Sequence, residues 1–441
     1  MRLSLPKYKI MLALWLLPLS SAHAIDLLQA YELALVNDPT FRSAIHENEA
    51  GQQNAKIGLS GLLPSLTLTH AQGINRGTLR QGGVTQPLNF DNEVTTLALR
   101  QPLLNLEAVA GYRQGLAQAN SSQSRFSGEA DRLIIRLTEV YFEALLAKEQ
   151  LALAKAQRDA LAELRQVNEN MFKRGEGTRT DVLETQSRFS LAQAQLIEAQ
   201  DAWDAARLAL SALVGESVGE LASLNKIFQI QPLVPADFES WQEMAQARNA
   251  ELVTQRYLIE TSKQEVMRSR SGHAPRVELV ASLSRNNSAS FVTADRDARL
   301  ASVGVEINIP IFAGGRVNAT TDQARANQAR AETELDAMTN QAMLELRTQY
   351  QLLQSSILRI QSLEMAVESA NLLVEATEKS IRGGIRINLD LLDAQSQFYS
   401  AQVNLAEARY NYLLAYLRLR FLAGTLELDD LRKVATYFVG Q

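Results

Sequence analysis

The feature that most constrains the fold is a stretch of 67 residues, Arg316–Arg382, that contains neither glycine nor proline. It is rich in Ala, Gln, Glu, Leu and Arg, which are strong helix formers. At about 1.5 Å per residue, one continuous helix of this length would extend roughly 100 Å. Apolar residues recur in it at helical spacing, as at Leu353, Ile357 and Ile360, whereas its charged and amide side chains exclude a membrane-spanning helix. We therefore expect a long rod whose apolar side must be covered by further helices.

The amino-terminal residues 1–24 have the composition of a secretory signal peptide. They contain the basic residues Arg2, Lys7 and Lys9, the apolar run 10–19, and the small-residue site Ala22-His23-Ala24. The apolar run is too short to cross a bilayer as a helix. Cleavage after Ala24 would remove three basic and no acidic residues from the 44 basic and 49 acidic residues of the full chain. This acidic balance disfavours binding to nucleic acid.

The residues that most often carry enzyme chemistry are absent or scattered. The chain contains no cysteine, which excludes disulfides, thiolate metal sites and a lipid attached to an amino-terminal cysteine. His46, His70 and His273 lack the spacing of a zinc site. The paired glycines lack the continuation of a phosphate-binding loop, and no nucleophile elbow is present. We predict a protein that is not an enzyme and that binds no metal or cofactor.

Part of the sequence is an internal repeat. Residues 173–215 align with residues 382–424 at a constant offset of 209 positions and without a gap. The identities include the pairs Gly175/Gly384, Asp181/Asp390, Leu183/Leu392, Phe189/Phe398 and Gly215/Gly424. Chance similarity between two alanine-rich helices would match the alanines, but not the glycines, the aspartate and the phenylalanine in register. We therefore predict two internal repeats.

Each half has the predicted order helix, strand, strand, long helix, turn, helix. The predicted divisions are a signal peptide (1–24), a first repeat (25–215), a linker (216–236), a second repeat (237–424) and a carboxy-terminal tail (425–441). The first helix of each half is predicted at 27–58 and at 238–269. The strands are predicted at 65–76, 95–101, 277–285 and 300–311, with polar loops at 77–92 and 286–297.

The predicted strands alternate between apolar and polar residues. The pattern is clearest at Val303, Val305, Ile307, Ile309 and Ile311, and each strand has about the ten residues that a tilted strand needs to cross a membrane. A soluble sheet with one buried face would show the same alternation. The predicted signal peptide, the polar loops and the lack of an element to cover the sheet favour the membrane. Four strands cannot close a barrel, and open edges in lipid are costly, so we expect subunits to associate into barrels of eight, twelve or sixteen strands.

The two repeated turns resemble those of the TolC-like outer-membrane channel family. The residues that carry this resemblance are Phe-Lys-Arg-Gly-Glu-Gly-Thr-Arg-Thr-Asp-Val-Leu-Glu-Thr-Gln at 172–186 and Arg-Gly-Gly-Ile-Arg-Ile-Asn-Leu-Asp-Leu-Leu-Asp-Ala-Gln at 382–395. The resemblance covers essentially the whole chain after residue 24. It implies a helix-dominated fold in which a homotrimer forms a twelve-stranded β-barrel in outer-membrane lipid and a twelve-helix α-barrel in the periplasm.

The resemblance also implies roles for the helix tips. Asp390 and Asp393 match aspartates that ring the periplasmic entrance, Arg386 matches an arginine that holds neighbouring coils shut, and Thr180 and Asp181 match the polar pair that this arginine contacts. A periplasmic adaptor would dock on the tips, at Arg174, Gly175, Gly177, Gly383 and Gly384. Ile381 departs from the pattern, because some members carry a tyrosine there, so one latch hydrogen bond is missing or replaced.

The chemistry of the acidic residues is independent of the resemblance. Asp390 and Asp393 are three positions apart and share a helix face, and three copies around an axis would place six acids at a narrowing that favours cations. These residues, together with Asp181 and Glu184, would also complement the helix dipole as acids near a helix amino terminus. Both roles are compatible.

The tip sequence Gly-Glu-Gly-Thr-Arg-Thr-Asp resembles that of type I secretion members of the family. This favours a passive outer-membrane duct for an unfolded protein, driven by an inner-membrane ABC transporter. The alternatives are the outer-membrane component of a small-molecule efflux pump, with an RND pump as partner, and an elongated structural coiled-coil protein of the periplasm or surface.

Overall fold

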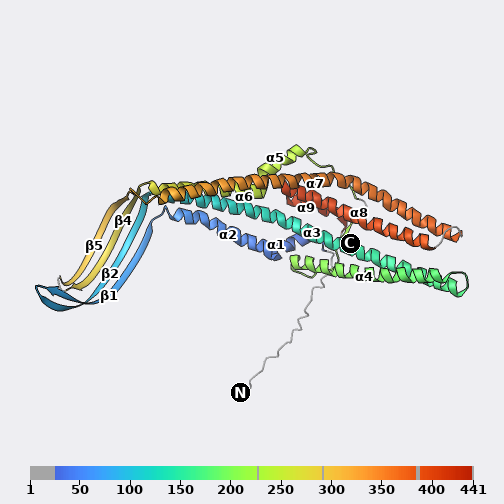
Figure 1. The fold of residues 1–441 in the computed structure, drawn as a ribbon, viewed down its shortest axis with the longest axis horizontal. Coiled ribbons are helices and arrows are strands. Elements are labelled where there is room, and N and C mark those ends of the chain that lie inside the picture. Colours follow the sequence, from blue (N-terminus) through green and yellow to red (C-terminus); the bar gives the residue numbers. More distant parts are fainter. Residues whose placement is uncertain (1–24, 226–227, 291–292, 384–387, 440–441) are drawn as a thin grey trace, which may run out of the picture.

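The computed structural model describes residues 25–225, 228–290, 293–383 and 388–439. A small sheet lies at one end of an elongated molecule, and long helices extend from it to the other end (Figure 1). The predicted signal peptide, residues 1–24, lies outside the described residues. No helix in the described ranges is both long enough and apolar enough to cross a membrane.

The helices of the described residues are α1 (Leu27–Asn37), α2 (Pro39–Ser60), α3 (Leu106–Lys173), α4 (Arg179–Val214), α5 (Phe238–Arg248), α6 (Ala250–Arg270), the short 3₁₀ helix η1 (Ser271–His273), α7 (Arg316–Arg382), α8 (Asn388–Leu422) and α9 (Leu428–Ala435). The strands are β1 (Ser65–Gln81), β2 (Val84–Leu104), β3 (Ser223–Leu224), β4 (Arg276–Ser290), β5 (Thr293–Asn308) and β6 (Phe438–Val439). The predicted rod is confirmed, because α7 is one helix of 67 residues with the predicted bounds.

The prediction of one helix at 27–58 and one at 238–269 is wrong, because each is divided in two. Asp38 ends α1, and its carboxylate accepts hydrogen bonds from two backbone N–H groups of α2, which begins with Pro39. The side-chain oxygen of Asn249 does the same for α6. A side chain that satisfies these N–H groups allows the chain to turn and a new helix to begin.

The residues at the two breaks also bind the carboxy-terminal ends of α4 and α8. The amide of Asn37 donates to the carbonyl of Val214 at the end of α4 (2.7 Å), and the amide of Asn249 donates to the carbonyl of Leu422 at the end of α8 (2.9 Å). Consequently α2 and α4 together follow one side of α3, and α6 and α8 together follow the other. Helix α7 packs on α6 and α8, which gives a layer four helices wide.

The sheet has the strand order β1-β2-β4-β5, and every pair of neighbours is antiparallel. The predicted polar loops at 77–92 and 286–297 are wrong, because the strands continue through most of both segments. Gly82 and Gly83, with φ of 61° and 84°, form the tight turn between β1 and β2. Side-chain alternation marks only the part of a strand with one apolar face. Backbone pairing continues where this alternation is lost, so the sequence pattern underestimated the strand lengths.

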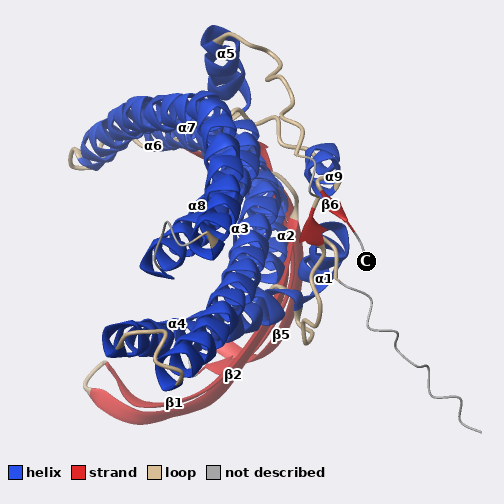
Figure 2. Cartoon of the chain, turned by 90° about the vertical axis from the view of Figure 1, so that its right-hand side faces the viewer, coloured by secondary structure: helices blue, strands red, loops and turns tan. Residues whose placement is uncertain are grey.

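The core lies near the middle of the molecule. Fully buried residues there include Trp241 of α5, Tyr141 of α3 and Leu417 of α8. The carboxy-terminal segment contributes α9 and the strand β6, which pairs with β3. The long helices form an arc, with α1, α9 and β6 on its convex side (Figure 2). This packing fixes the two hairpins, α3–α4 and α7–α8, whose free tips lie at the end opposite the sheet.

Candidate functional site at the helix tips

The turn between α3 and α4 is a compact loop with two constrained glycines. Arg174 ends α3, and Gly175 follows with φ of 77°, a conformation that favours glycine. A Cβ at Gly177 would lie 3.2 Å from the Cβ of Met171, so this position also favours the smallest residue. Arg174 and Glu176 form an ion pair at 3.2 Å across the turn. The loop therefore presents one exposed pair of opposite charges at its tip.

Asp181 belongs to a capping box at the start of α4. Its backbone N–H donates to Oγ1 of Thr178 (3.1 Å), and its Oδ2 accepts from both the backbone N–H (3.2 Å) and the hydroxyl (2.7 Å) of Thr178. The neighbouring Thr180 is exposed. The predicted role of Asp181 as a helix amino-terminal acid is confirmed, since these bonds satisfy the first turn of α4.

The turn between α7 and α8 is described only in part. Gly383 ends α7 with φ of −82°, an ordinary backbone conformation, so nothing in its φ requires glycine. Arg386 and Gly384 lie outside the described residues. Ile381 is half-buried near the end of α7, and Asp390 is half-buried in the first turn of α8.

Asp393 joins the two hairpins of the chain. Nη1 of Arg188, on α4, donates to Oδ1 of Asp393, on α8, at 2.8 Å. Nη2 of Arg188 also contacts Oε1 of Glu184 at 3.4 Å. Glu184 and Asp393 occupy equivalent positions at the 209-residue offset, so the arginine lies between two matching acids. Sequence analysis missed Arg188, although an arginine four residues after Glu184, where the other hairpin has Gln397, was a usable signal.

An apolar contact lies beside this ion pair. Leu161 of α3, Ala192 of α4 and Leu392 of α8 form a small buried cluster, and Phe189 packs against it. A cavity of about 140 Å³ adjoins the cluster and is lined in part by Arg188 and Leu392. The hairpins of one chain thus meet through a small apolar core as well as one ion pair.

The interiors of the two hairpins differ near the tips. Buried Asn168 of α3 donates to the hydroxyl of Thr185 on α4 (2.7 Å), which in turn donates to the carbonyl of Asp181 (2.6 Å). The equivalent positions in the second hairpin are Thr377 and Ala394, which are both buried. The hydroxyl of Thr377 has no hydrogen-bond partner among the described residues. The first hairpin therefore has a polar link between its helices that the second one lacks.

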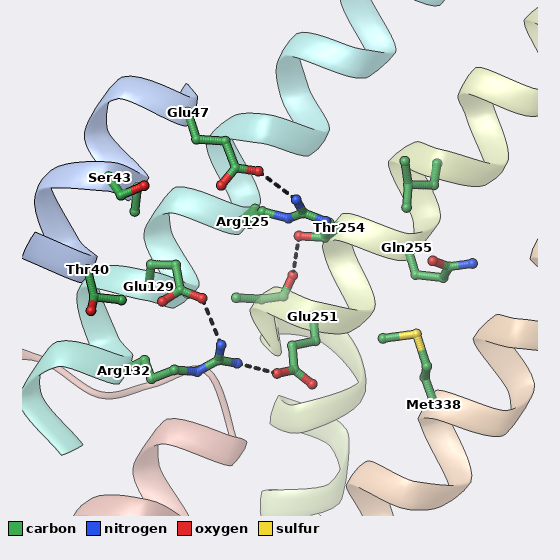
Figure 3. Close-up of a pocket in the computed structure, with 14 residues that line it drawn as sticks. Thr40, Ser43, Glu47, Arg125, Glu129, Arg132, Glu251, Thr254, Gln255 and Met338 are labelled. Atoms are coloured by element: carbon green, nitrogen blue, oxygen red, sulfur yellow. Dashed lines mark hydrogen bonds and ion pairs between the residues drawn. The ribbon is translucent and has the colours of Figure 1, made fainter. Parts of the chain in front are cut away.

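A separate pocket of about 520 Å³ lies between α2, α3 and α6 (Figure 3). Its arginines are matched by carboxylates: Arg125 contacts Glu47 (2.7 Å), and Arg132 contacts Glu129 (2.7 Å) and Glu251 (2.6 Å). These pairs join the three helices and leave neither arginine free for a ligand. The helix tips remain the better candidate site.

Comparison with known proteins identifies the class of molecule. The sequence matches the family described as "Outer membrane efflux protein" over residues 30–216 and 241–425. The chain belongs to this family. The predicted relationship to TolC-like channels is therefore confirmed, and the protein is an outer-membrane export channel and not an enzyme.

Individual relatives support the same conclusion. The chain is 42% identical to the alkaline protease secretion protein AprF of Pseudomonas aeruginosa, with 97% of this chain and 90% of that protein covered. It is 37% identical to the proteases secretion protein PrtF of Dickeya chrysanthemi, with 95% and 92% covered. The solved structure of the outer-membrane channel OprN superposes with a TM-score of 0.78 over 90% of each chain, at 20% identity. This last likeness supports the fold.

Proposed function

We propose that three copies of this chain close into a tube, with a twelve-stranded barrel above a twelve-helix barrel. The observation that carries the proposal is the sheet with two open edges: β1 and β5 each pair with only one neighbour among the described strands. In lipid, unpaired edge groups cost several kcal/mol each. Pairing β5 of one copy with β1 of the next removes both edges. The helical layer has matching free sides, at α2 and α4 on one edge and at α7 on the other.

One face of the sheet has the character of a lipid-facing surface. Val303, Val305 and Ile307 on β5 are 57–77% exposed in the single chain. The pairing register continues their rows across the sheet, from Leu66 to Leu99, Ala281 and Val303. The opposite face carries Arg100, which contacts Glu278 (3.3 Å) and Glu306 (3.4 Å). An apolar outer face and a polar lumen follow from this alternation.

We infer that the duct exports an unfolded protease in a type I system. AprF and PrtF are named for protease secretion, and their similarity to this chain extends along almost its whole length. An inner-membrane ABC transporter would supply the energy. A periplasmic adaptor would dock on the helix tips, at Arg174, Gly175, Gly177, Gly383 and Gly384.

The acids near the tips are proposed to form the entrance ring. Asp390 and Asp393 would supply six carboxylates in a trimer, with Arg386, Thr180 and Asp181 linking neighbouring coils. The duplicated plan of 25–215 and 237–424, joined by 216–236, would then place two similar hairpins per copy around the entrance. The matching helix breaks at Asp38 and Asn249 support this division.

Two measurements test the proposal. The purified protein is expected to be a trimer in detergent by light scattering and to form discrete cation-selective conductances in a planar bilayer. In a host that lacks its own duct but carries the protease, transporter and adaptor, the chain should restore secretion. A folded monomer that is stable in aqueous buffer without detergent would contradict the assembly, and a conducting trimer that does not restore secretion would contradict the cargo.

A further inference from the structure

A groove lies on the apolar face of the sheet, at the end of the apolar rows that is farther from the helices. Its volume is about 380 Å³, and its lining includes Leu68, Leu97 and Leu283 together with Arg285 and Arg299. The register places the three leucines in one row across β1, β2 and β4. The next row toward the sheet's turns contains His70, Thr95 and the two arginines. The groove is therefore apolar on one side and basic on the other.

The two arginines lie directly opposite each other on β4 and β5. Like charges in this arrangement destabilise a sheet. Arg285 forms a bidentate ion pair with Asp297, in which Nε donates to Oδ1 at 3.1 Å and Nη2 donates to Oδ2 at 3.0 Å. Arg299 forms no ion pair or hydrogen bond of its own in the described ranges, although its charge also interacts with Asp297. Beyond this row, Glu93 and Asp91 of β2 lie on the same face, farther from the leucines.

The height of the arginine row matches a membrane boundary. Apolar residues alternate from Ala301 to Ile307 on β5, and the alternation continues in the sequence to Ile309 and Ile311 beyond the strand's end at Asn308. In extended backbone this segment would span roughly 33 Å, or about 25 Å after the usual tilt of barrel strands. This is the height of the apolar band of outer-membrane barrels. The lower end of the band lies beside the helices, which the family places in the periplasm. The arginines therefore lie at the headgroup level of the outer leaflet.

We propose that Arg285 and Arg299 bind the phosphate of an outer-leaflet lipid, one of whose acyl chains lies along Leu68, Leu97 and Leu283. A phosphate between the two guanidinium groups would reduce the repulsion that the single carboxylate of Asp297 leaves, and would give Arg299 hydrogen-bonding partners through paired N–H···O bonds. The leucine row gives the chain an apolar track that a free phosphate ion would not use. The proposal rests on the placement of this sheet in the membrane given above.

The test uses the full-length protein in detergent and measures lipid affinity by native mass spectrometry. The probes are bisphosphorylated lipid A, the same lipid without its phosphates, and inorganic phosphate. The variant combines Arg285→Gln with Arg299→Gln, and the matched control is Arg100→Gln on the opposite face. The double variant is expected to bind bisphosphorylated lipid A about tenfold more weakly, as for the loss of a charged hydrogen-bonded pair. The control should bind it as the wild type does.

Three outcomes would overturn the proposal. The first is that the double variant binds bisphosphorylated lipid A as tightly as the wild type does. The second is that the wild type binds the dephosphorylated lipid as tightly as the bisphosphorylated one. The third is that inorganic phosphate, at the same concentration as the lipid, displaces the lipid completely. Conductance of the same samples in a planar bilayer separates this inference from the proposed duct. A double variant that conducts and keeps its lipid rejects the site alone, whereas a wild-type protein that never conducts rejects the duct.

Discussion

Arg188 forms the ion pair that joins the two hairpins near their tips. Ile381 has no hydrogen-bonding side chain, so the latch hydrogen bond that the family resemblance implies at this position must be missing or replaced. The pair of Arg188 and Asp393, at 2.8 Å, is a polar connection between α4 and α8 within one chain. We expect it to contribute to the closed state of the entrance.

Arg188→Gln is therefore expected to shift the channel toward the open state. Exposed ion pairs are worth up to about 1 kcal/mol, which corresponds to at most about a fivefold change per protomer. Single-channel recordings should show a larger open fraction, and Arg188→Lys should restore part of the closed state. Arg207→Gln removes a pair within one helix and serves as the control. Equal open fractions in Arg188→Gln and the wild type would remove this pair from the gate.

Asp131 on α3 gives a prediction about pH. Burial raises the pKa of its carboxyl group from 3.8 to about 6. Ionising this group in the folded protein costs free energy, so stability should fall as the pH rises from about 4 through 6. Asp131→Asn should stabilise the protein by about 1 kcal/mol at pH 7.5, after allowance for partial exposure, and by much less at pH 4. Thermal unfolding at both pH values checks this, with the exposed Asp159→Asn as control; a gain that is the same at both pH values would contradict it.

At the scale of elements, the sequence predicted long uniform segments well and interruptions poorly. The bounds of α7 follow from the absence of glycine and proline between Gly315 and Gly383. The breaks at Asp38 and Asn249 depend on side chains that cap one helix and contact another, and helical periodicity does not report such contacts. In the site, Asp181 was predicted as a helix acid from its position, but the partner of Asp393 depends on how α4 packs beside α8.

The different interiors of the hairpins predict different responses to similar substitutions. Thr185→Val removes the acceptor of buried Asn168 and should destabilise the first hairpin by about 1–3 kcal/mol. Thr377→Val replaces a buried hydroxyl that has no partner in the described part of the chain, so it should be neutral or stabilising. Hydrogen exchange near residues 161–192 and 370–400 would resolve the two hairpins separately. Unchanged protection of the first hairpin in Thr185→Val would show that the polar link does not stabilise it.

At the scale of the whole molecule, the acids acquire their proposed function only when three chains surround one axis. Within one chain, the carboxylates already differ: Asp181 caps its own helix, Asp393 binds Arg188, and Asp390 has no ion pair with a described residue. An ion pair of a carboxylate and an arginine contributes little net potential to a lumen, whereas an unpaired carboxylate contributes its full negative charge. The ring is therefore expected to depend mainly on Asp390.

Asp390→Asn should weaken channel block by trivalent cations about tenfold. Removing the whole ion pair, by combining Asp393→Asn with Arg188→Gln, should weaken block less, because two paired opposite charges contribute little net potential at the entrance. Hexaamminecobalt titrations of single-channel current measure both effects. Asp204→Asn is the control, since this exposed acid lies on α4 away from the tip and its loss should leave block unchanged. If the combined Asp393→Asn and Arg188→Gln variant loses block and Asp390→Asn keeps it, the entrance ring does not depend on Asp390, and Asp393 binds the cation in the assembled entrance.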